Sequence, residues 1–323
     1  MLARYAPLRV HHIIVRGIPV RPFSTTKLPN GITLAYDLHE PPNTAQFSQN
    51  APPIIFMHGL FGSKKNNRSM SKYAPMHTSP LKRPTTSNPS TRIFARDLNR
   101  PVYALDLRNH GDSSHNATHD YTSMASDVEA FIQENKLEYS TLIGHSMGAK
   151  TAMTVALRGR VPIADVIPVD NAPVDAALKS DFGKYMQGMR RIAESNCKRQ
   201  SDADAILQNY EDSLPIRQFL LTNMVRDPET GVQKWRIPID VLGRALDRMA
   251  DFPFKDPEDA RFGGRTLFVR GTKSHYVADE MLPIIGRFFP KFQVADVEAG
   301  HWLISEKPEE FRRVVVEFLQ NKE

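Results

Sequence analysis

The chain has 323 residues, a formal net charge of +6, 41% hydrophobic residues and a single cysteine, Cys197. Its length fits one large domain or two ordinary ones, and no apolar run reaches the roughly 18 residues of a membrane-spanning helix, so we expect no integral membrane span. One cysteine excludes an intramolecular disulfide and a Cys-rich metal site, and it suits a reducing compartment.

The N-terminal segment, residues 1–23, carries much of the positive charge. It holds four arginines and no acidic residue, and without those four charges the net charge falls from +6 to +2. This pattern is typical of a mitochondrial transit peptide, with a disordered basic tail as the alternative. Residues 21–24 resemble the recognition pattern of the matrix protease, so we expect the mature chain to begin near Ser24 in the mitochondrion, most simply the matrix.

The globular part begins near Lys27. Asn30-Gly31 predicts a hairpin turn, with residues 32–36 as its second strand. A polar, proline-bearing connector at 41–53 leads to a buried strand at 54–57.

Residues 63–100 hold nine Lys or Arg against one acid, Asp97. Within them, residues 73–94 are rich in Pro, Ser and Thr and lack any periodicity, which predicts a flexible surface insertion. No aromatic residues interleave with these charges at a useful spacing, so we expect no nucleic-acid partner.

Strand and helix patterns alternate in the rest of the chain, which predicts a mostly parallel α/β sheet with helices on both faces. The pattern is interrupted from about residue 174 to 254, where the β signal disappears and a helical cap is predicted. We therefore divide the globular part into a first core segment (24–173), the cap (174–258) and a second core segment (259–323). The strands are expected at 102–107, 142–143, 166–169, 265–270 and 292–297, and the helices at 121–135, 149–157, 182–194, 202–210, 214–224, 239–249, 281–289 and 308–320.

A Gly-x-Ser-x-Gly pattern centred on Ser146 joins a predicted strand directly to a predicted helix. The pattern alone is common enough to occur by chance, so the flanking elements carry the argument. Gly144 and Gly148 leave room where the two backbones converge, and a strained turn pushes the serine hydroxyl outward. Ser146 is therefore our candidate nucleophile.

A serine nucleophile needs a base, and the base needs an acid to orient it. His301 follows the last strand at the same sheet edge as Ser146, and we predict it as the base. Asp170 ends an earlier apolar strand and is predicted as the acid, although it could instead cap the first helix of the cap. The loop after the strand at 265–270 offers no carboxylate, and Asp279 lies several residues further on.

Three other histidines flank tight glycine turns and are expected to hydrogen-bond the backbone there: His58, His110 and His145. For the tetrahedral oxyanion we predict two backbone donors, the N–H groups of Leu60 and Met147. No metal-ligand pattern and no glycine-rich phosphate loop is present in the sequence, so we predict no cofactor and no metal.

These features resemble the mitochondrial abhydrolase-domain esterase group, which includes the yeast ethanol acetyltransferases and related bacterial esterases. The resemblance runs from about residue 27 to the end. It implies an α/β-hydrolase fold with a helical cap, a triad of Ser146, Asp170 and His301, and acyl-ester or thioester chemistry. Residues 73–94 depart from the pattern, because they separate segments that would ordinarily form one helix. The motifs are HGLFGSKKN at 58–66, DLRNHGDS at 106–113, GHSMGAK at 144–150, VDNAP at 169–173 and GHW at 300–302.

We therefore predict a mitochondrial serine hydrolase that cleaves small-molecule carboxylic esters or thioesters, such as acyl-CoA, through an acyl-enzyme on Ser146. One alternative passes the acyl group to an alcohol and forms acetate esters from acetyl-CoA and ethanol. The other is a non-catalytic binding protein of the same fold, which the presence of all three triad residue types argues against. Acyl chain length and oligomeric state do not follow from the sequence.

Overall fold

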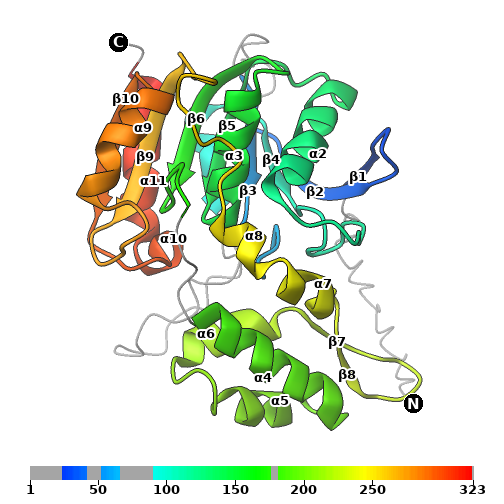
Figure 1. Cartoon of the computed structure of the whole chain (residues 1–323). Helices are drawn as coiled ribbons and strands as arrows, with labels where there is room; N and C mark the ends of the chain where they lie inside the picture. Colours follow the sequence, from blue (N-terminus) through cyan, green and yellow to red (C-terminus); the bar gives the residue numbers. More distant parts are fainter. Residues whose placement is uncertain (1–23, 42–51, 66–89, 176–180, 322–323) are drawn as a thin grey trace, which may run out of the picture.

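The computed structural model describes residues 24–41, 52–65, 90–175 and 181–321. Its centre is one eight-stranded sheet, made of β1 (Ser24–Lys27), β2 (Thr33–His39), β3 (Ile54–Met57), β4 (Val102–Leu105), β5 (Ser140–His145), β6 (Ile163–Val169), β9 (Arg265–Gly271) and β10 (Phe292–Val297). Their order across the sheet is β1-β2-β4-β3-β5-β6-β9-β10 (Figure 1). β2 pairs antiparallel with β1 and β4, and the other neighbours are parallel. The predicted mostly parallel sheet is confirmed.

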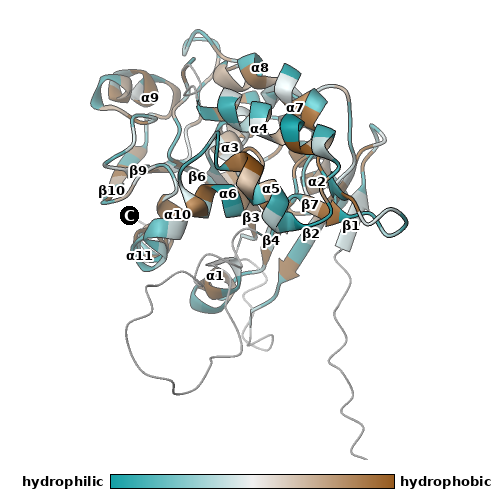
Figure 2. Ribbon diagram, turned by 90° about the horizontal axis from the view of Figure 1, so that it is seen from below, coloured by the Kyte–Doolittle hydropathy of each residue, from teal (hydrophilic) through white to brown (hydrophobic). Residues whose placement is uncertain are grey.

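Both faces of the central strands are buried. In β3, Ile55 and Met57 join one apolar cluster and Ile54 and Phe56 join the other, because successive side chains of a strand point to opposite faces. The helices cover the two faces as separate layers (Figures 1 and 2). The first layer is α2 (Tyr121–Glu134), α3 (Met147–Arg158) and α9 (Leu282–Phe288), the last preceded by the 3-10 helix η4 (Asp279–Met281); the second is α1 (Ser90–Leu98), α10 (Leu303–Glu306) and α11 (Pro308–Gln320).

Helix α1 corrects the predicted insertion at its C-terminal end. Residues 90–94 form the first part of this helix, and Phe94 is fully buried. Its ring meets Phe311 of α11 edge to face, with centroids 5.8 Å apart. The Pro-, Ser- and Thr-rich composition continues to the first residues of α1, so the sequence does not indicate where this helix begins. The rest of the predicted insertion, the predicted transit peptide and most of the predicted connector lie outside the described residues.

The cap lies between β6 and β9 in the chain and sits at the carboxyl ends of the parallel strands (Figures 1 and 2). Its helices are α4 (Asp181–Ser195), α5 (Gln200–Leu207), α6 (Leu214–Leu221), α7 (Ile239–Arg244) and α8 (Leu246–Ala250). The cap contains helices, but it also contains strands that the sequence did not predict: β7 (Met224–Arg226) and β8 (Gln233–Trp235) form an antiparallel hairpin. Each strand has only three residues, too few for a visible alternation. The turn is stabilised locally, since Asp227 accepts the Thr230 N–H at 2.8 Å and Gly231 has a φ of 70°.

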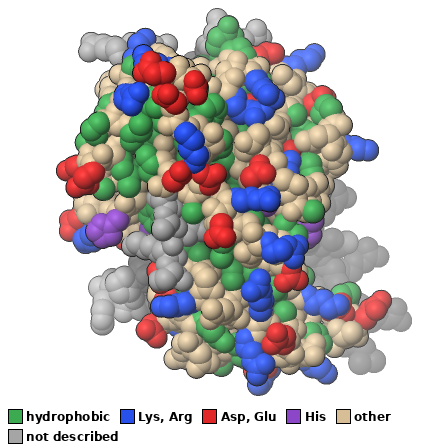
Figure 3. All heavy atoms as spheres, viewed as in Figure 1, with side chains coloured by type: hydrophobic (Ala, Val, Ile, Leu, Met, Phe, Trp, Pro, Cys, Tyr) green, Lys and Arg blue, Asp and Glu red, His purple; other side chains and the backbone are tan. Residues whose placement is uncertain are grey.

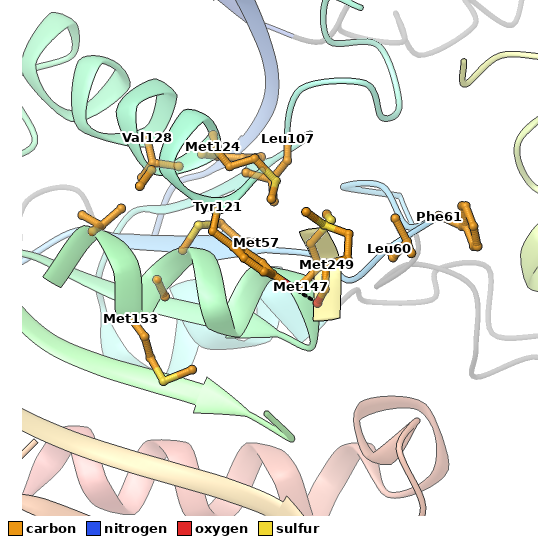
Figure 4. Packing of buried hydrophobic residues seen from close by; sticks show 14 of the residues in the cluster. Met57, Leu60, Phe61, Leu107, Tyr121, Met124, Val128, Met147, Met153 and Met249 are labelled. Carbon is orange, nitrogen blue, oxygen red and sulfur yellow. Dashed lines mark hydrogen bonds between the residues drawn. The ribbon is translucent and has the colours of Figure 1, made fainter. Parts of the chain in front are cut away.

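Buried polar groups attach the end of the cap to the core. The Tyr121 hydroxyl donates to the Met249 carbonyl at 2.8 Å (dashed in Figure 4), and Lys150 Nζ donates to the carbonyls of Ala250 and Asp251, each at 2.9 Å. These bonds link helices α2 and α3 to the C-terminal end of α8. The surrounding cluster is rich in methionine, as Figure 4 shows for Met57, Met124, Met147, Met153 and Met249.

On the face shown in Figure 3, acidic and basic side chains are interspersed over both core and cap. Within the described ranges, none of the helices combines the length and apolar character that crossing a bilayer requires.

Candidate active site

Ser146 sits on a sharp turn between β5 and α3. Its φ of 54° and ψ of −112° lie outside the ordinary regions for a residue with a side chain. The turn depends on glycines, because a Cβ on Gly144 would lie 2.1 Å from the Gly148 carbonyl oxygen and one on Gly148 would lie 2.5 Å from that of Met57. The Ser146 N–H donates to the Val169 carbonyl at 2.9 Å, which anchors the turn to β6. The hydroxyl is thereby presented at the carboxyl edge of the sheet.

His301 bridges the serine and the predicted acid. It lies in the loop between β10 and α10, with Nε2 3.0 Å from Ser146 Oγ and Nδ1 2.6 Å from Asp170 Oδ2. The Tyr276 ring stacks on the imidazole at a centroid distance of 4.3 Å, and His145 Nε2 donates to the His301 carbonyl at 2.8 Å. The ring is therefore held in the plane that joins the hydroxyl to the carboxylate.

Asp170 follows β6 with a positive φ of 51° and is fully buried. Oδ1 accepts the Gly271 N–H at 3.0 Å, and Oδ2 accepts the Ser274 hydroxyl at 2.6 Å in addition to His301. Burial opposes the charge, but the hydrogen bonds from His301, Ser274 and Gly271 outweigh it and hold the pKa of the Asp170 carboxyl below its usual range. A charged carboxylate therefore faces the imidazole near neutral pH.

The rival carboxylate is elsewhere. Asp279 has a side chain that is 76% exposed, and it pairs with Arg270 at 2.5 Å. Arg270 also binds Asp296 at 2.5 Å, so this cluster is a surface ion-pair network. Of the two carboxylates considered from the sequence, only Asp170 touches His301.

The two predicted oxyanion donors flank the nucleophile. Met147 is the first residue of α3, where a backbone N–H has no partner inside the helix. Leu60 follows Gly59 in the loop after β3, and a Cβ on Gly59 would lie 3.3 Å from Ser146 Cβ. Among the described residues, neither N–H donates to a backbone carbonyl. Both are therefore available to an oxygen atom bound beside Ser146.

The other histidines bind backbone, as the sequence predicts. His58 accepts the Leu107 N–H at 3.0 Å, and His110 accepts the Phe61 N–H at 3.1 Å. Burial lowers the pKa of His58 to about 4 and that of His110 to about 3, so both rings are neutral near pH 7. Burial also lowers the pKa of His145 to about 4, with the adjacent His301 adding to the effect. Neutral rings with one donor and one acceptor suit these structural positions.

Sequence reasoning missed several groups around the site. Nothing in the sequence indicates that Ser274 is a partner of the acid, yet its hydroxyl donates to Asp170 Oδ2. The loop after β3 is also fixed by a buried ion pair, in which Lys64 Nζ binds Asp106 and, at 2.6 Å, Asp112. The sequence features that could have indicated this ion pair are a lysine just after a glycine turn, Lys64, and an aspartate just after an apolar strand, Asp106. In the part of the chain that the structure describes, no cluster of three or more His, Cys, Asp or Glu side chains could hold a metal ion.

Comparison with known proteins identifies the family. Residues 52–308 match the alpha/beta hydrolase fold family. A probable alcohol acetyltransferase of Saccharomyces cerevisiae is 35% identical, with the match covering 90% of this chain and 84% of the relative. The sn-1-specific diacylglycerol lipase ABHD11 of Xenopus laevis is 34% identical, covering 90% and 85%. Among solved structures, a marine microorganism esterase has a TM-score of 0.73 at 28% identity, covering 88% of this chain and 98% of that one.

The chain belongs to the α/β-hydrolase fold family, and the resemblance seen in the sequence is confirmed. Within this class, the esterase and lipase relatives identify it as a carboxylic ester hydrolase.

Proposed function

We propose that this protein cleaves carboxylic esters or thioesters through an acyl-enzyme on Ser146, with His301 as general base and Asp170 as the acid that orients it. The observation that carries the proposal is the hydrogen-bonded chain from Ser146 Oγ through the imidazole to Asp170 Oδ2, at 3.0 Å and 2.6 Å. A buried carboxylate with a lowered pKa favours the imidazolium that forms when the serine loses its proton.

In the first half-reaction, Ser146 Oγ attacks the carbonyl carbon and its proton passes to His301 Nε2. The carbonyl oxygen becomes an oxyanion, which the Leu60 and Met147 N–H groups stabilise. When the intermediate collapses, the bond to the leaving alcohol or thiol breaks and His301 returns the proton to that group. An ester of Ser146 remains.

In the second half-reaction, His301 takes a proton from water and the resulting hydroxide attacks the acyl-enzyme. Collapse of the second oxyanion intermediate breaks the bond to Ser146 Oγ, which takes the proton back. The net result is hydrolysis to an acid and an alcohol or thiol, and no external cofactor takes part.

The substrate class is a small-molecule ester or thioester, and the relatives' names suggest which compounds to test. We propose acyl-CoA thioesters and glycerides alongside simple acetate esters, because relatives carry the names alcohol acetyltransferase and sn-1-specific diacylglycerol lipase. A panel of p-nitrophenyl esters, acyl-CoA thioesters and diacylglycerols, tested with wild type and Ser146→Ala, decides the matter. We expect the wild type to hydrolyse at least one class and Ser146→Ala to hydrolyse none. Equal turnover by both proteins would refute the assignment of Ser146.

A second candidate function, alcohol acyl transfer, is supported by relatives named as acetyltransferases. They include the Saccharomyces cerevisiae protein and ethanol acetyltransferase 1 of Cyberlindnera fabianii, which is 28% identical. An alcohol would replace water in the second half-reaction and leave with the acyl group as an ester. Acetyl-CoA supplied with ethanol should then give ethyl acetate at the expense of acetate. Acetate alone at high ethanol would leave only hydrolysis.

We also propose a mitochondrial location, on the strength of the arginine-bearing, acid-free N-terminus. A fusion of residues 1–40 to a fluorescent protein should reach mitochondria, whereas a version with Arg4, Arg9, Arg16 and Arg21 changed to Gln should not. Equal distribution of the two fusions would contradict the proposal.

A further inference from the structure

The loop that carries Leu60 is a tight turn from Gly59 to Gly62, closed by the Gly62 N–H donating to the Gly59 carbonyl at 2.9 Å. His58 Nδ1 donates to the same carbonyl at 2.8 Å. The C=O and N–H of a planar trans peptide point in opposite directions, so fixing the Gly59 carbonyl directs the Leu60 N–H the other way. Gly59 packs against Ser146, and the turn therefore sets where this N–H lies relative to the nucleophile.

The turn contains a strained residue. Phe61 has a φ of 60°, a conformation that favours glycine and is costly for an aromatic residue. Three contacts hold it there. Its N–H donates to His110 at 3.1 Å, its carbonyl accepts from Asn223 Nδ2 at 2.7 Å, and its ring packs near that of Phe182 with centroids 6.1 Å apart. His110 belongs to the core, but Asn223 and Phe182 belong to the cap. Figure 4 shows Phe61 beside Leu60 on this loop.

Asn223 is built into the cap between α6 and β7 and is 1% exposed in the assembled chain. Nδ2 also faces the Leu220 carbonyl at 3.2 Å, and the Asn223 carbonyl accepts the Arg236 N–H at 2.8 Å. Two carbonyl partners fix the amide orientation, since only the NH2 end can donate. Within the described residues the amide oxygen has no hydrogen-bond partner. The hydrogen bonds of this side chain are therefore the ones that its nitrogen donates to the Phe61 and Leu220 carbonyls.

We propose that Asn223 is a positioning residue for ester hydrolysis. Its hydrogen bond to the Phe61 carbonyl keeps the strained turn in place, so the Leu60 N–H reaches the oxyanion only when the cap is docked on the core. The inference rests on the proposed acyl-enzyme function. It makes the cap part of the oxyanion-stabilising machinery as well as a cover for the site.

The test compares Asn223→Ala and Asn223→Leu with a matched control, Asn209→Ala. Asn209 is an exposed cap asparagine that follows α5, and its amide donates to two carbonyls of that helix, at 3.2 Å and 3.4 Å. Removing an oxyanion donor outright costs about 10²–10³ in kcat, and a displaced donor should cost less, about 10–100-fold. We expect both Asn223 variants to lose kcat by this factor with KM nearly unchanged, and Asn209→Ala to match the wild type.

A second measurement separates positioning from a general loss of folded enzyme. A trifluoromethyl ketone forms a tetrahedral adduct with the nucleophilic serine, so its Ki reports oxyanion stabilisation. The ratio of KM to Ki does not depend on the folded fraction, and we expect it to fall about 10–100-fold in the Asn223 variants. An unchanged ratio, or a rise in KM alone, would overturn the role of Asn223. A wild type that hydrolyses no ester in the panel would instead overturn the proposed function beneath it.

Discussion

Replacing Asp170 by asparagine should abolish most activity while leaving the fold intact. The carboxylate accepts three hydrogen bonds, from Gly271, Ser274 and His301. In the variant, the amide oxygen must accept the hydrogen bond from the Gly271 N–H, because this backbone group can only donate. The NH2 group then faces His301 Nδ1, which must accept a hydrogen bond and so loses its proton. That proton moves to Nε2, where it points at the serine and prevents the ring from acting as a base.

The same change costs about 10⁴ in kcat in a serine protease, equivalent to about 5 kcal/mol of transition-state stabilisation. We expect a loss of this size here. Because the pKa of Asp170 lies below its usual range, the carboxylate stays charged across ordinary assay conditions, and the loss should be similar from pH 6 to pH 9.

Steady-state hydrolysis of p-nitrophenyl acetate measures the effect, with circular dichroism to confirm folding. Asp279→Asn is the control, since Asp279 pairs with Arg270 at the surface and should be nearly silent. If Asp279→Asn cripples the enzyme while Asp170→Asn retains most of its activity, the reasoning is refuted.

Two further predictions concern stability and use urea unfolding. Burial lowers the pKa of Lys150 from 10.5 to about 8, so the unfolded chain binds more protons than the folded chain between these two pH values. The stability of the wild type relative to Lys150→Met should therefore rise with pH across this window, by about 3 kcal/mol. A stability difference that does not change with pH would contradict this. Phe94→Ala should lower the free energy of unfolding by about 3–5 kcal/mol, because the ring is fully buried against Phe311. A loss below about 1 kcal/mol would mean that α1 does not pack on the core as described.

The sheet and the arrangement of the three site residues could be predicted because their signals are local. Strands buried on both faces are continuous apolar runs, and Ser146 and Asp170 each follow such a run. His301 follows β10, the strand at the edge of the sheet. Parallel strands bring their carboxyl ends to one edge, so residues far apart in sequence are expected to meet there. The distances of 2.6 Å and 3.0 Å in the structure are what this reasoning requires.

What the sequence did not reveal depends on pairings between distant segments. Nothing local in Asn223 indicates that its amide reaches Phe61, 162 residues earlier in the chain. Lys150 lies 100 residues from the Ala250 carbonyl to which it donates. From the sequence alone, a lysine in this helix is expected to be exposed to solvent, because its partner belongs to the cap. The β7–β8 hairpin and the start of α1 were missed for a different reason, since short strands and a Ser- and Thr-rich helix start lack the periodicity on which prediction relies.

Trapping the covalent intermediate tests the central claim most directly. The protein is mixed with a p-nitrophenyl ester, quenched with acid within the first turnover, digested and analysed by mass spectrometry. We expect the peptide that contains Ser146 to gain the mass of the acyl group, with fragmentation assigning it to that serine, and Ser146→Ala to gain none. An acyl group on another residue, or continued turnover by Ser146→Ala at the wild-type rate, would contradict the account.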